Sequence, residues 1–114
     1  MAANLIKGAK ANITASGVAA TVEGIPSPFH VAVQVTASAL SGTITFEGTT
    51  DGTNWAAIEL YPSTDLADTG LTATATAAGL FVSKGALAFS AFRARCSAFT
   101  SATDAVANVR VACV

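Results

Sequence analysis

Few side chains in this sequence have the type and the spacing that catalysis requires. His30 is the one histidine, and it is flanked by Phe29 and Val31 instead of the partners of a Ser/His/Asp or Cys/His site. A general base needs a positioned partner and an adjusted pKa. A lone histidine on the outer face of a strand is therefore expected to be an ordinary surface residue and not a catalytic base. The acidic residues are scattered along the chain. We therefore predict that the protein is not an enzyme.

The sequence predicts no metal or cofactor site. Asp65 and Asp68 share a loop, but the ligand spacing of an EF-hand is missing, and a solvated loop is the simpler interpretation. Cys96 and Cys113 lack a CxxC spacing, and one histidine does not complete a zinc site. The glycines form no phosphate-binding motif. The two cysteines are expected to be buried, reduced thiols that can pair only if their strands are neighbours.

Two groups of side chains suit a contact surface. The first is Trp55 beside Glu47, an aromatic platform for a sugar ring or a partner protein. The second is formed by Arg93 and Arg95, which share one face of a predicted strand, with Arg110 beside them if the last two strands form a hairpin. Arginine favours bidentate pairing with carboxylates at interfaces. A solvated sheet face with ordinary charge is the plainer interpretation of the arginines, and it stays open.

The segment 42–60 (GTITFEGTTDGTNWAAIEL) predicts the β-hairpin that would position Glu47 and Trp55. Ile44 and Phe46 alternate with polar residues, which is typical of a half-buried strand. A two-residue turn would mix apolar and polar residues on each face, because a slip of one residue turns every side chain over. A three-residue loop at 50–52 keeps the faces separate.

The three-residue loop sets the register of the hairpin. The expected partners are Ile44 with Ile58 and Phe46 with Ala56. Gly52 then lies where a left-handed bulge residue is needed. Trp55 falls beside Glu47, on the face opposite the apolar residues, unless a second bulge at 56–57 turns it inward. Both placements of Trp55 stay open at this point.

The rest of the chain predicts further short strands. Residues 29–36 (FHVAVQVT) alternate most clearly, and other strands are expected at 9–15, 18–22, 71–78, 80–83, 88–99 and 105–113. The side chains expected to face inward on the last two are Phe92, Ala94, Cys96, Ala98, Val109, Val111 and Cys113. About eight short strands, each with one apolar face, predict an all-β fold, an antiparallel β-sandwich that is jelly-roll-like or immunoglobulin-like. We expect an N-terminal arm at 1–8, a single sandwich domain over 9–114 and a loop through 61–70.

The composition favours a subunit of an assembly. Hydrophobic residues make up 52% of the chain, but aromatic residues make up 7% and charged residues 11%. Typical soluble domains carry about 25% charged residues. A β protein with a weakly charged surface of small side chains tends to associate edge to edge. Such a surface is tolerated most easily where neighbouring subunits cover it.

Charge and hydropathy argue against several partners. The net charge of −1 argues against general nucleic-acid binding, which requires a strongly basic face. No run approaches the ~18 apolar residues of a membrane span. The first residues, MAANLIKGAKANITA, contain no apolar core of a secretory signal peptide. We expect no nucleic acid, no membrane and no export by the usual route.

The hairpin TITFEGTTDGTNWAAIEL, the strand GLFV and the C-terminal segment FRARCSAFTSATDAVANVRVACV together resemble small structural proteins of tailed bacteriophages. The resemblance covers residues 42–60 and 79–113. In that group a TFEG…DGTNW-like hairpin precedes a strand with an R-x-R pattern and a closing Thr/Val-rich strand. The group usually has a glycine in its last hairpin, whereas residues 101–104 here are SATD. The resemblance implies a β-sandwich component of the virion that acts by binding.

These observations together predict a non-enzymatic virion structural protein. The resemblance implies a capsid decoration (cement) protein that forms a homo-oligomer, with a trimer favoured, and binds the major capsid protein or other virion proteins. The interface candidates are Trp55, Glu47, Arg93, Arg95 and Arg110. The alternative is a carbohydrate-binding or host-recognition module of a phage tail, with Trp55 as the stacking platform and Tyr61 as its companion. No cofactor is expected, and the expected location is the virion, after synthesis in the host cytoplasm.

Overall fold

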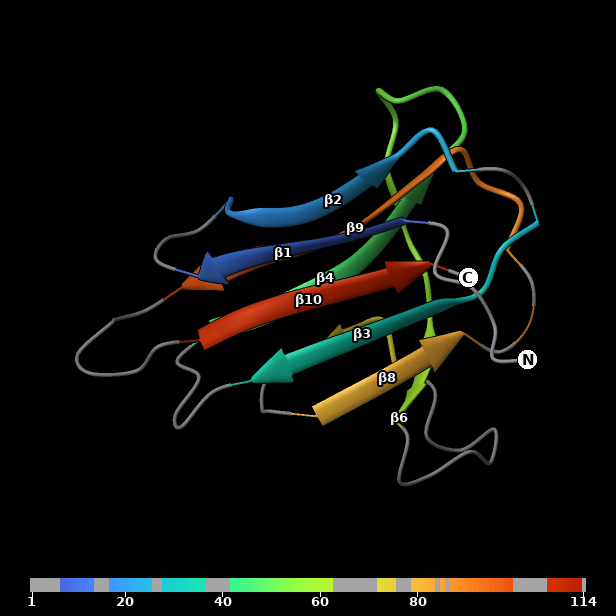
Figure 1. The fold of residues 1–114 in the computed structure, drawn as a ribbon. Coiled ribbons are helices and arrows are strands. Elements are labelled where there is room, and N and C mark those ends of the chain that lie inside the picture. The colour runs from blue at the N-terminus through green and yellow to red at the C-terminus, as the bar shows by residue number, and fades with distance from the viewer. Residues whose placement is uncertain are drawn as a thin grey trace.

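The computed structural model describes residues 7–13, 17–25, 28–36, 42–62, 72–75, 79–83, 85, 87–99 and 107–113. Within these ranges the chain forms strands and no helix, and therefore no helix that is long and apolar enough to cross a membrane (Figure 1). The strands are β1 (Lys7–Ile13), β2 (Ala19–Glu23), β3 (Val31–Thr36), β4 (Gly42–Thr49), β5 (Ala56–Ala57), β6 (Leu60–Pro62), β7 (Thr74–Ala75), β8 (Gly79–Ser83), β9 (Ala91–Phe99) and β10 (Ala107–Cys113).

The strands form two antiparallel sheets that pack face to face. The front sheet, which faces the viewer in Figure 1, has the order β1-β10-β3-β8-β6. The back sheet has the order β2-β9-β4-β5, and β7 also pairs with β4. This arrangement confirms the predicted all-β sandwich.

The strand order distinguishes between the two predicted topologies. The pairs β1–β10, β2–β9, β3–β8 and β4–β7 are nested, so the first half of the chain pairs with the second half in reverse order. This is the order that a long double ribbon takes when it rolls up, which is the jelly-roll arrangement. In an immunoglobulin-like sandwich, consecutive strands would lie side by side in one sheet more often. Among the described strands only β4 and β5 are consecutive neighbours.

Alternation along the strands builds the core, as the sequence predicts. On β3, Val31, Val33 and Val35 are buried, while Gln34 and Thr36 are exposed. Phe92, Ala94 and Cys96 of β9 and Val109, Val111 and Cys113 of β10 are also buried. The rings of Phe46, from the back sheet, and Phe81, from the front sheet, lie 5.1 Å apart between their centroids. Their contact joins the two layers at the centre of the sandwich.

A bulge corrects the predicted alternation at the end of β9. Thr43 pairs with Ala98, but Ile44 pairs with Cys96, so Ser97 is an extra residue in the ladder. The bulge shifts the face of the residues that follow it. Ala98 is therefore exposed instead of buried, and the prediction that it faces inward is wrong.

The predicted register of the 42–60 hairpin is also wrong. Gly48 pairs with Ala56, and the backbone N–H of Ile58 donates to the carbonyl of Phe46 at 2.8 Å, so the second strand is shifted by two residues. The shift seats Ile58 over Gly48, where an added Cβ would collide with the Ile58 side chain. The second strand ends at Ala57, and the chain then crosses to the front sheet as β6.

The connecting loop is longer than predicted because Asp51 organises it. The Asp51 carboxylate accepts hydrogen bonds from the backbone N–H groups of Thr53 and Asn54, both at 2.8 Å, and from the Asn54 side chain at 2.7 Å. Gly52 has a φ of 81°, which confirms the predicted left-handed residue. The closed loop therefore extends beyond Gly52 to Asn54.

Other predicted segments differ in their limits. β1 begins at Lys7, inside the predicted arm, and residues 1–6 lie outside the described residues. Only Thr74–Ala75 of the predicted strand at 71–78 forms a described strand. β6 occupies the start of the predicted loop at 61–70, and Asp65 and Asp68 lie outside the described residues.

Candidate interaction surfaces

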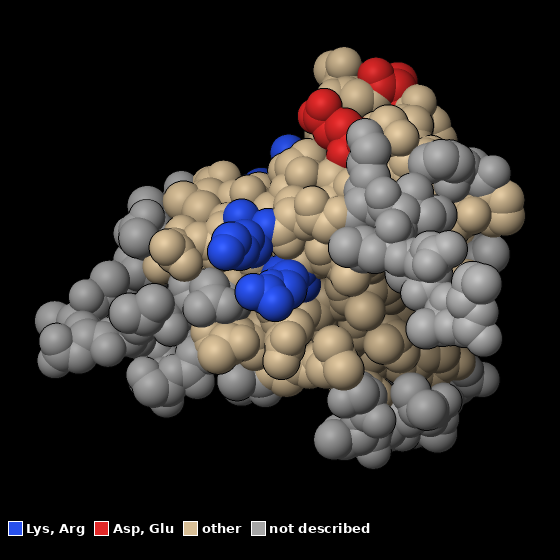
Figure 2. All heavy atoms as spheres, in the orientation of Figure 1, with Lys and Arg blue, Asp and Glu red and all other residues tan. Residues whose placement is uncertain are grey.

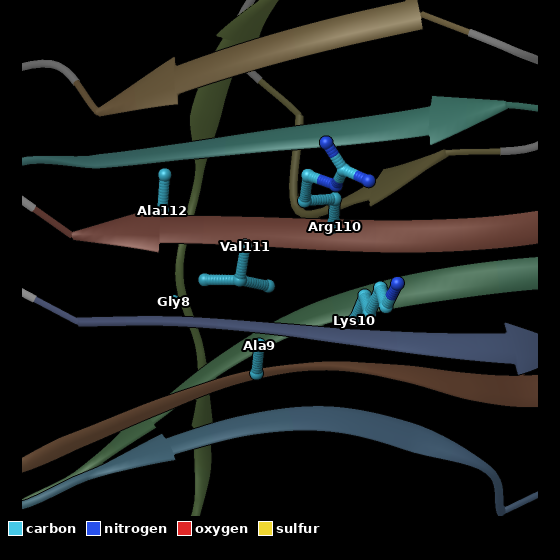
Figure 3. Close-up of a pocket in the computed structure, with 6 residues that line it drawn as sticks. All are labelled: Gly8, Ala9, Lys10, Arg110, Val111 and Ala112. Carbon is cyan, nitrogen blue, oxygen red and sulfur yellow. The ribbon is translucent and has the colours of Figure 1, made fainter. Parts of the chain in front are cut away.

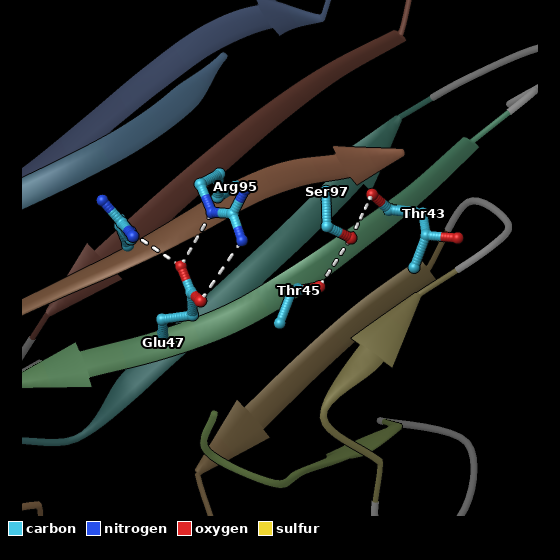
Figure 4. A network of polar contacts seen from close by, with 6 residues as sticks. Thr43, Thr45, Glu47, Arg95 and Ser97 are labelled. Carbon is cyan, nitrogen blue, oxygen red and sulfur yellow. Dashed lines mark hydrogen bonds and ion pairs between the residues drawn. The ribbon is translucent and has the colours of Figure 1, made fainter. Parts of the chain in front are cut away.

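Three charged side chains form a compact cluster on the outer face of the back sheet. Glu47 of β4 lies opposite Arg93 of β9, and Arg95 lies one position further along the same face. The Glu47 Oε1 atom accepts hydrogen bonds from Arg93 Nε at 2.7 Å and from Arg95 Nε at 3.0 Å (Figure 4). We call Glu47, Arg93 and Arg95 the Glu47 cluster.

The Glu47 cluster is partly removed from solvent. The side chains of Glu47, Arg93 and Arg95 are 11%, 24% and 32% exposed. Burial alone would raise the pKa of Glu47, but the hydrogen bonds and positive charges of Arg95 and Arg93 outweigh it and hold the pKa below its ordinary value. One carboxylate therefore neutralises part of the charge of two arginines, and the cluster stabilises the pairing of β4 with β9.

Trp55 lies against the Glu47 cluster. The guanidinium carbon of Arg93 is 4.1 Å from the centroid of the Trp55 ring, within the range of a cation–π contact. Arg93 is thus held between a carboxylate and an aromatic face. This geometry places Trp55 on the side of the sheet predicted by the hairpin argument, and the alternative inward placement is wrong. One face of the ring is occupied by Arg93, so at most the other face is open to a ligand.

Hydroxyl groups continue this outer face beyond the cluster. Thr45 Oγ1 donates to Ser97 Oγ at 2.8 Å, and Ser97 Oγ donates to the Thr43 carbonyl at 3.3 Å (Figure 4). The bulged residue Ser97 therefore tethers β9 to β4 through its side chain. Like the Glu47 cluster, this group is satisfied by contacts within the protein.

Arg110 does not join the other two arginines, which corrects the predicted three-arginine group. β10 lies in the front sheet between β1 and β3, whereas β9 lies in the back sheet, so the last two strands form no hairpin. Arg110 is exposed on the outer face of the front sheet. Its partner in the register is Lys10 of β1. Sequence reasoning missed Lys10, because pairing between strands so distant in the chain leaves no local pattern.

The outer face of the front sheet consists of rows that run across the strands. The row that contains the two basic residues is Lys10, Arg110, Gln34 and Leu80. The neighbouring row is Gly8, Ala112, Ala32, Val82 and Tyr61. Figure 2 shows two basic groups side by side on this face, whereas the visible acidic groups gather at the end where the β4–β5 loop lies. We call the first set the basic row and the second the small row.

Shallow hollows flank the two basic side chains. One, of about 320 Å³, is lined by Gly8, Ala9, Lys10, Arg110, Val111 and Ala112 (Figure 3). Another, of about 260 Å³, is lined by Lys10, Ala11, Asn12 and Arg110. Gly8 has no side chain and Ala112 has only a methyl group, so the space beside Lys10 and Arg110 stays open to solvent.

Neither cysteine contributes to a surface site. Cys96 and Cys113 are buried and free, as predicted, and they lie on different sheets. Burial raises the pKa of the Cys113 thiol to about 11, so this thiol stays protonated at neutral pH. The part of the chain described by the structure contains no group of three residues that could hold a metal ion.

The Asp51 loop gives a test of the hairpin geometry. Its hydrogen bonds, first of all those from the Asn54 and Thr53 backbone, hold the pKa of Asp51 well below its ordinary value. In Asp51→Ala we expect amide hydrogen exchange at Thr53 and Asn54 to accelerate at least about tenfold, because both amides lose their acceptor. Asp51→Asn keeps one acceptor oxygen and should show a smaller change. Unchanged exchange in Asp51→Ala would contradict the capping role.

No family model and no curated protein matches the chain. Among solved structures, the crystal structure of SPBc2 prophage-derived protein YomS is similar, with a TM-score of 0.61 and 13% sequence identity. The match covers 99% of this chain and 100% of that chain. At this identity the likeness shows the fold alone, and it extends over the full sandwich of both proteins.

Proposed function

We propose that this protein is a non-enzymatic structural component of a bacteriophage virion, a decoration (cement) protein that oligomerises and binds the capsid surface. The observation that carries the proposal is the fold likeness to SPBc2 prophage-derived protein YomS over the whole of both chains. The jelly-roll topology supports it, because this architecture is common in viral capsid proteins. The resemblance of the hairpin and C-terminal segments to phage structural proteins points the same way.

The surface chemistry suits a protein that binds to the capsid surface and packs against other copies of itself. Only 11% of the residues are charged, so much of the surface can be buried against neighbours at little desolvation cost. β1 and β6 end the front sheet, and strand edges are ready sites for association. We propose a homo-oligomer, with a trimer favoured, in which Arg95 of the Glu47 cluster and the adjacent Trp55 contribute to contacts between subunits.

The proposal predicts where the protein is found. Particles are purified by density gradient from cells that produce the phage encoding this chain, and heads and tails are then separated. Mass spectrometry should detect the protein in the head fraction, and light scattering of the purified chain should give the mass of an oligomer. Particles from a strain lacking the gene are the control. Detection in tails only would overturn the decoration role, and absence from both fractions would overturn the virion role.

Carbohydrate binding gains no comparable support. The ring of Trp55 has Arg93 on one face, and sugar sites usually combine several aromatic platforms. A titration of Trp55 fluorescence with a panel of oligosaccharides tests this alternative directly, since stacking on the remaining face would change the emission.

A further inference from the structure

Two basic side chains on the outer face of the front sheet, Lys10 and Arg110, have no acidic partner among the residues that the structure describes. Lys10 and Arg110 are exposed and lie directly opposite each other in the β1–β10 pair. Within the described ranges, Glu47 forms ion pairs with Arg93 and Arg95, and neither Lys10 nor Arg110 takes part in an ion pair with a described residue. Like charges directly opposite one another on a sheet are destabilising. The fold therefore tolerates a repulsive pair at this position.

The two sheets differ in whether their basic side chains contact a carboxylate. On the back sheet the Glu47 carboxylate accepts hydrogen bonds from Arg93 and Arg95 and partly neutralises their charge, and Arg93 also lies on the Trp55 ring. On the front sheet the described residues of the basic row and the small row include no aspartate or glutamate. A carboxylate supplied from outside the chain would relieve the repulsion between Lys10 and Arg110.

The surroundings of Lys10 and Arg110 suit an extended peptide. The small row offers Gly8, Ala112 and Ala32 beside the two charges, with an open hollow of about 320 Å³ next to them. The basic row itself ends with Leu80, the one exposed large hydrophobic side chain in the described part, at 41% exposure. A carboxylate can therefore bind between the basic groups while a neighbouring apolar side chain lies on the small row.

A symmetric contact between two copies does not fit this face. A two-fold axis through the front sheet would bring Lys10 and Arg110 of one protomer against the same residues of its partner. Four positive charges would then meet without a carboxylate. The occupant must instead be acidic where it meets the basic row.

We propose that the outer face of the front sheet, centred on Lys10 and Arg110, is the docking surface for an acidic segment of another virion protein. The inference deepens the proposed function, on which the identity of the partner as a virion protein rests. It assigns the binding of that partner to the front sheet, whereas the contacts between copies of this chain are proposed for Arg95 and Trp55 on the back sheet.

The test uses the full-length chain and a defined probe. A peptide of alternating glutamate and alanine is titrated into the ¹⁵N-labelled protein at low salt, with alternating glutamine and alanine as the neutral probe. Chemical shift changes are expected at Gly8, Lys10, Arg110 and Ala112 with the acidic peptide only. Raising the salt from 50 to 500 mM should weaken binding about tenfold, because exposed charges are screened.

Variants separate a specific site from general attraction. The double variant Lys10→Gln/Arg110→Gln should lose at least about tenfold in affinity while its melting temperature stays the same or rises, because the like-charge pair is gone. Lys10→Arg/Arg110→Lys keeps both charges and should keep binding. Glu59→Gln changes the net charge at an exposed position outside both rows and should leave the titration unchanged.

Each contrary result has a clear meaning. Shifts elsewhere, or equal binding by the double variant, would overturn the docking surface. Tighter binding of a single-stranded oligonucleotide than of the acidic peptide would mean that the partner is a nucleic acid and not a protein. A change in oligomeric mass in the double variant would mean that the partner is a second copy of this chain. Because the titration needs no particles, peptide binding by a chain absent from virions would refute the proposed function and leave the acidic-segment site standing.

Discussion

Replacing Phe46 with alanine is expected to lower the free energy of unfolding by about 3–5 kcal/mol, the usual cost of a large cavity in a core. Phe46 is fully buried, and its ring lies 5.1 Å from that of Phe81 in the opposite sheet. Domains of this size have a total stability of about 5–15 kcal/mol. The melting temperature should therefore fall by about 10–20 °C, measured by calorimetry or circular dichroism.

The Phe46 prediction has two matched controls. Phe46→Leu keeps most of the volume and should cost less than about 1.5 kcal/mol. Leu80→Ala removes an exposed large side chain and should change the stability by less than about 0.5 kcal/mol. If Phe46→Ala costs no more than Leu80→Ala in denaturant unfolding, the contact between Phe46 and Phe81 does not join the two sheets.

Glu47→Gln is expected to lower the free energy of unfolding by about 1.5–3 kcal/mol, because two partly buried arginines lose their counter-ion. The value lies below that of a fully buried pair, since the Arg93 and Arg95 side chains are 24% and 32% exposed and solvent screens them. Denaturant unfolding at pH 7 measures the effect. Glu59→Gln, at an exposed position, should be close to neutral.

The pH dependence gives an independent readout of the same cluster. The pKa of Glu47 is lower in the folded state than its ordinary value of 4.5, so its contribution is fully present above that value. The contribution is lost as the pH falls through the folded pKa, because protonation then favours the unfolded chain. The wild-type protein should lose its advantage over Glu47→Gln in this acidic range. A constant difference between the two proteins down to low pH would contradict an ionised Glu47.

A triple variant tests the physical cause of the loss. Replacing the Glu47 cluster with Glu47→Leu/Arg93→Met/Arg95→Met removes the charges together with their partner. Apolar replacement of a whole buried ion cluster is often close to neutral. We therefore expect the triple variant to recover most of the stability that Glu47→Gln loses. A triple variant as unstable as the single one would mean that packing, and not unpaired charge, causes the loss.

The hairpin shows how much of the site follows from local sequence. Alternation of Ile44 and Phe46 with polar residues places Glu47 on the outer face, and Trp55 lies there too. The observed register differs by two residues from the predicted one, and a two-residue shift leaves every side chain on the same face. The outward placement of Trp55, one of the two that the sequence leaves open, therefore holds in the observed register as well as in the predicted one. The loop length was missed because it depends on which amides the Asp51 carboxylate binds.

The class of the fold and the face on which most side chains lie follow from the residues alone, because the two-residue period of a strand is a local property of the backbone. Which strands are neighbours follows from the packing of the whole domain. Lys10 lies beside Arg110, and Arg93 and Arg95 lie on the other sheet with Glu47, because the jelly roll pairs opposite ends of the chain. Such pairing depends on packing the whole core at once, so no short segment of the sequence records it.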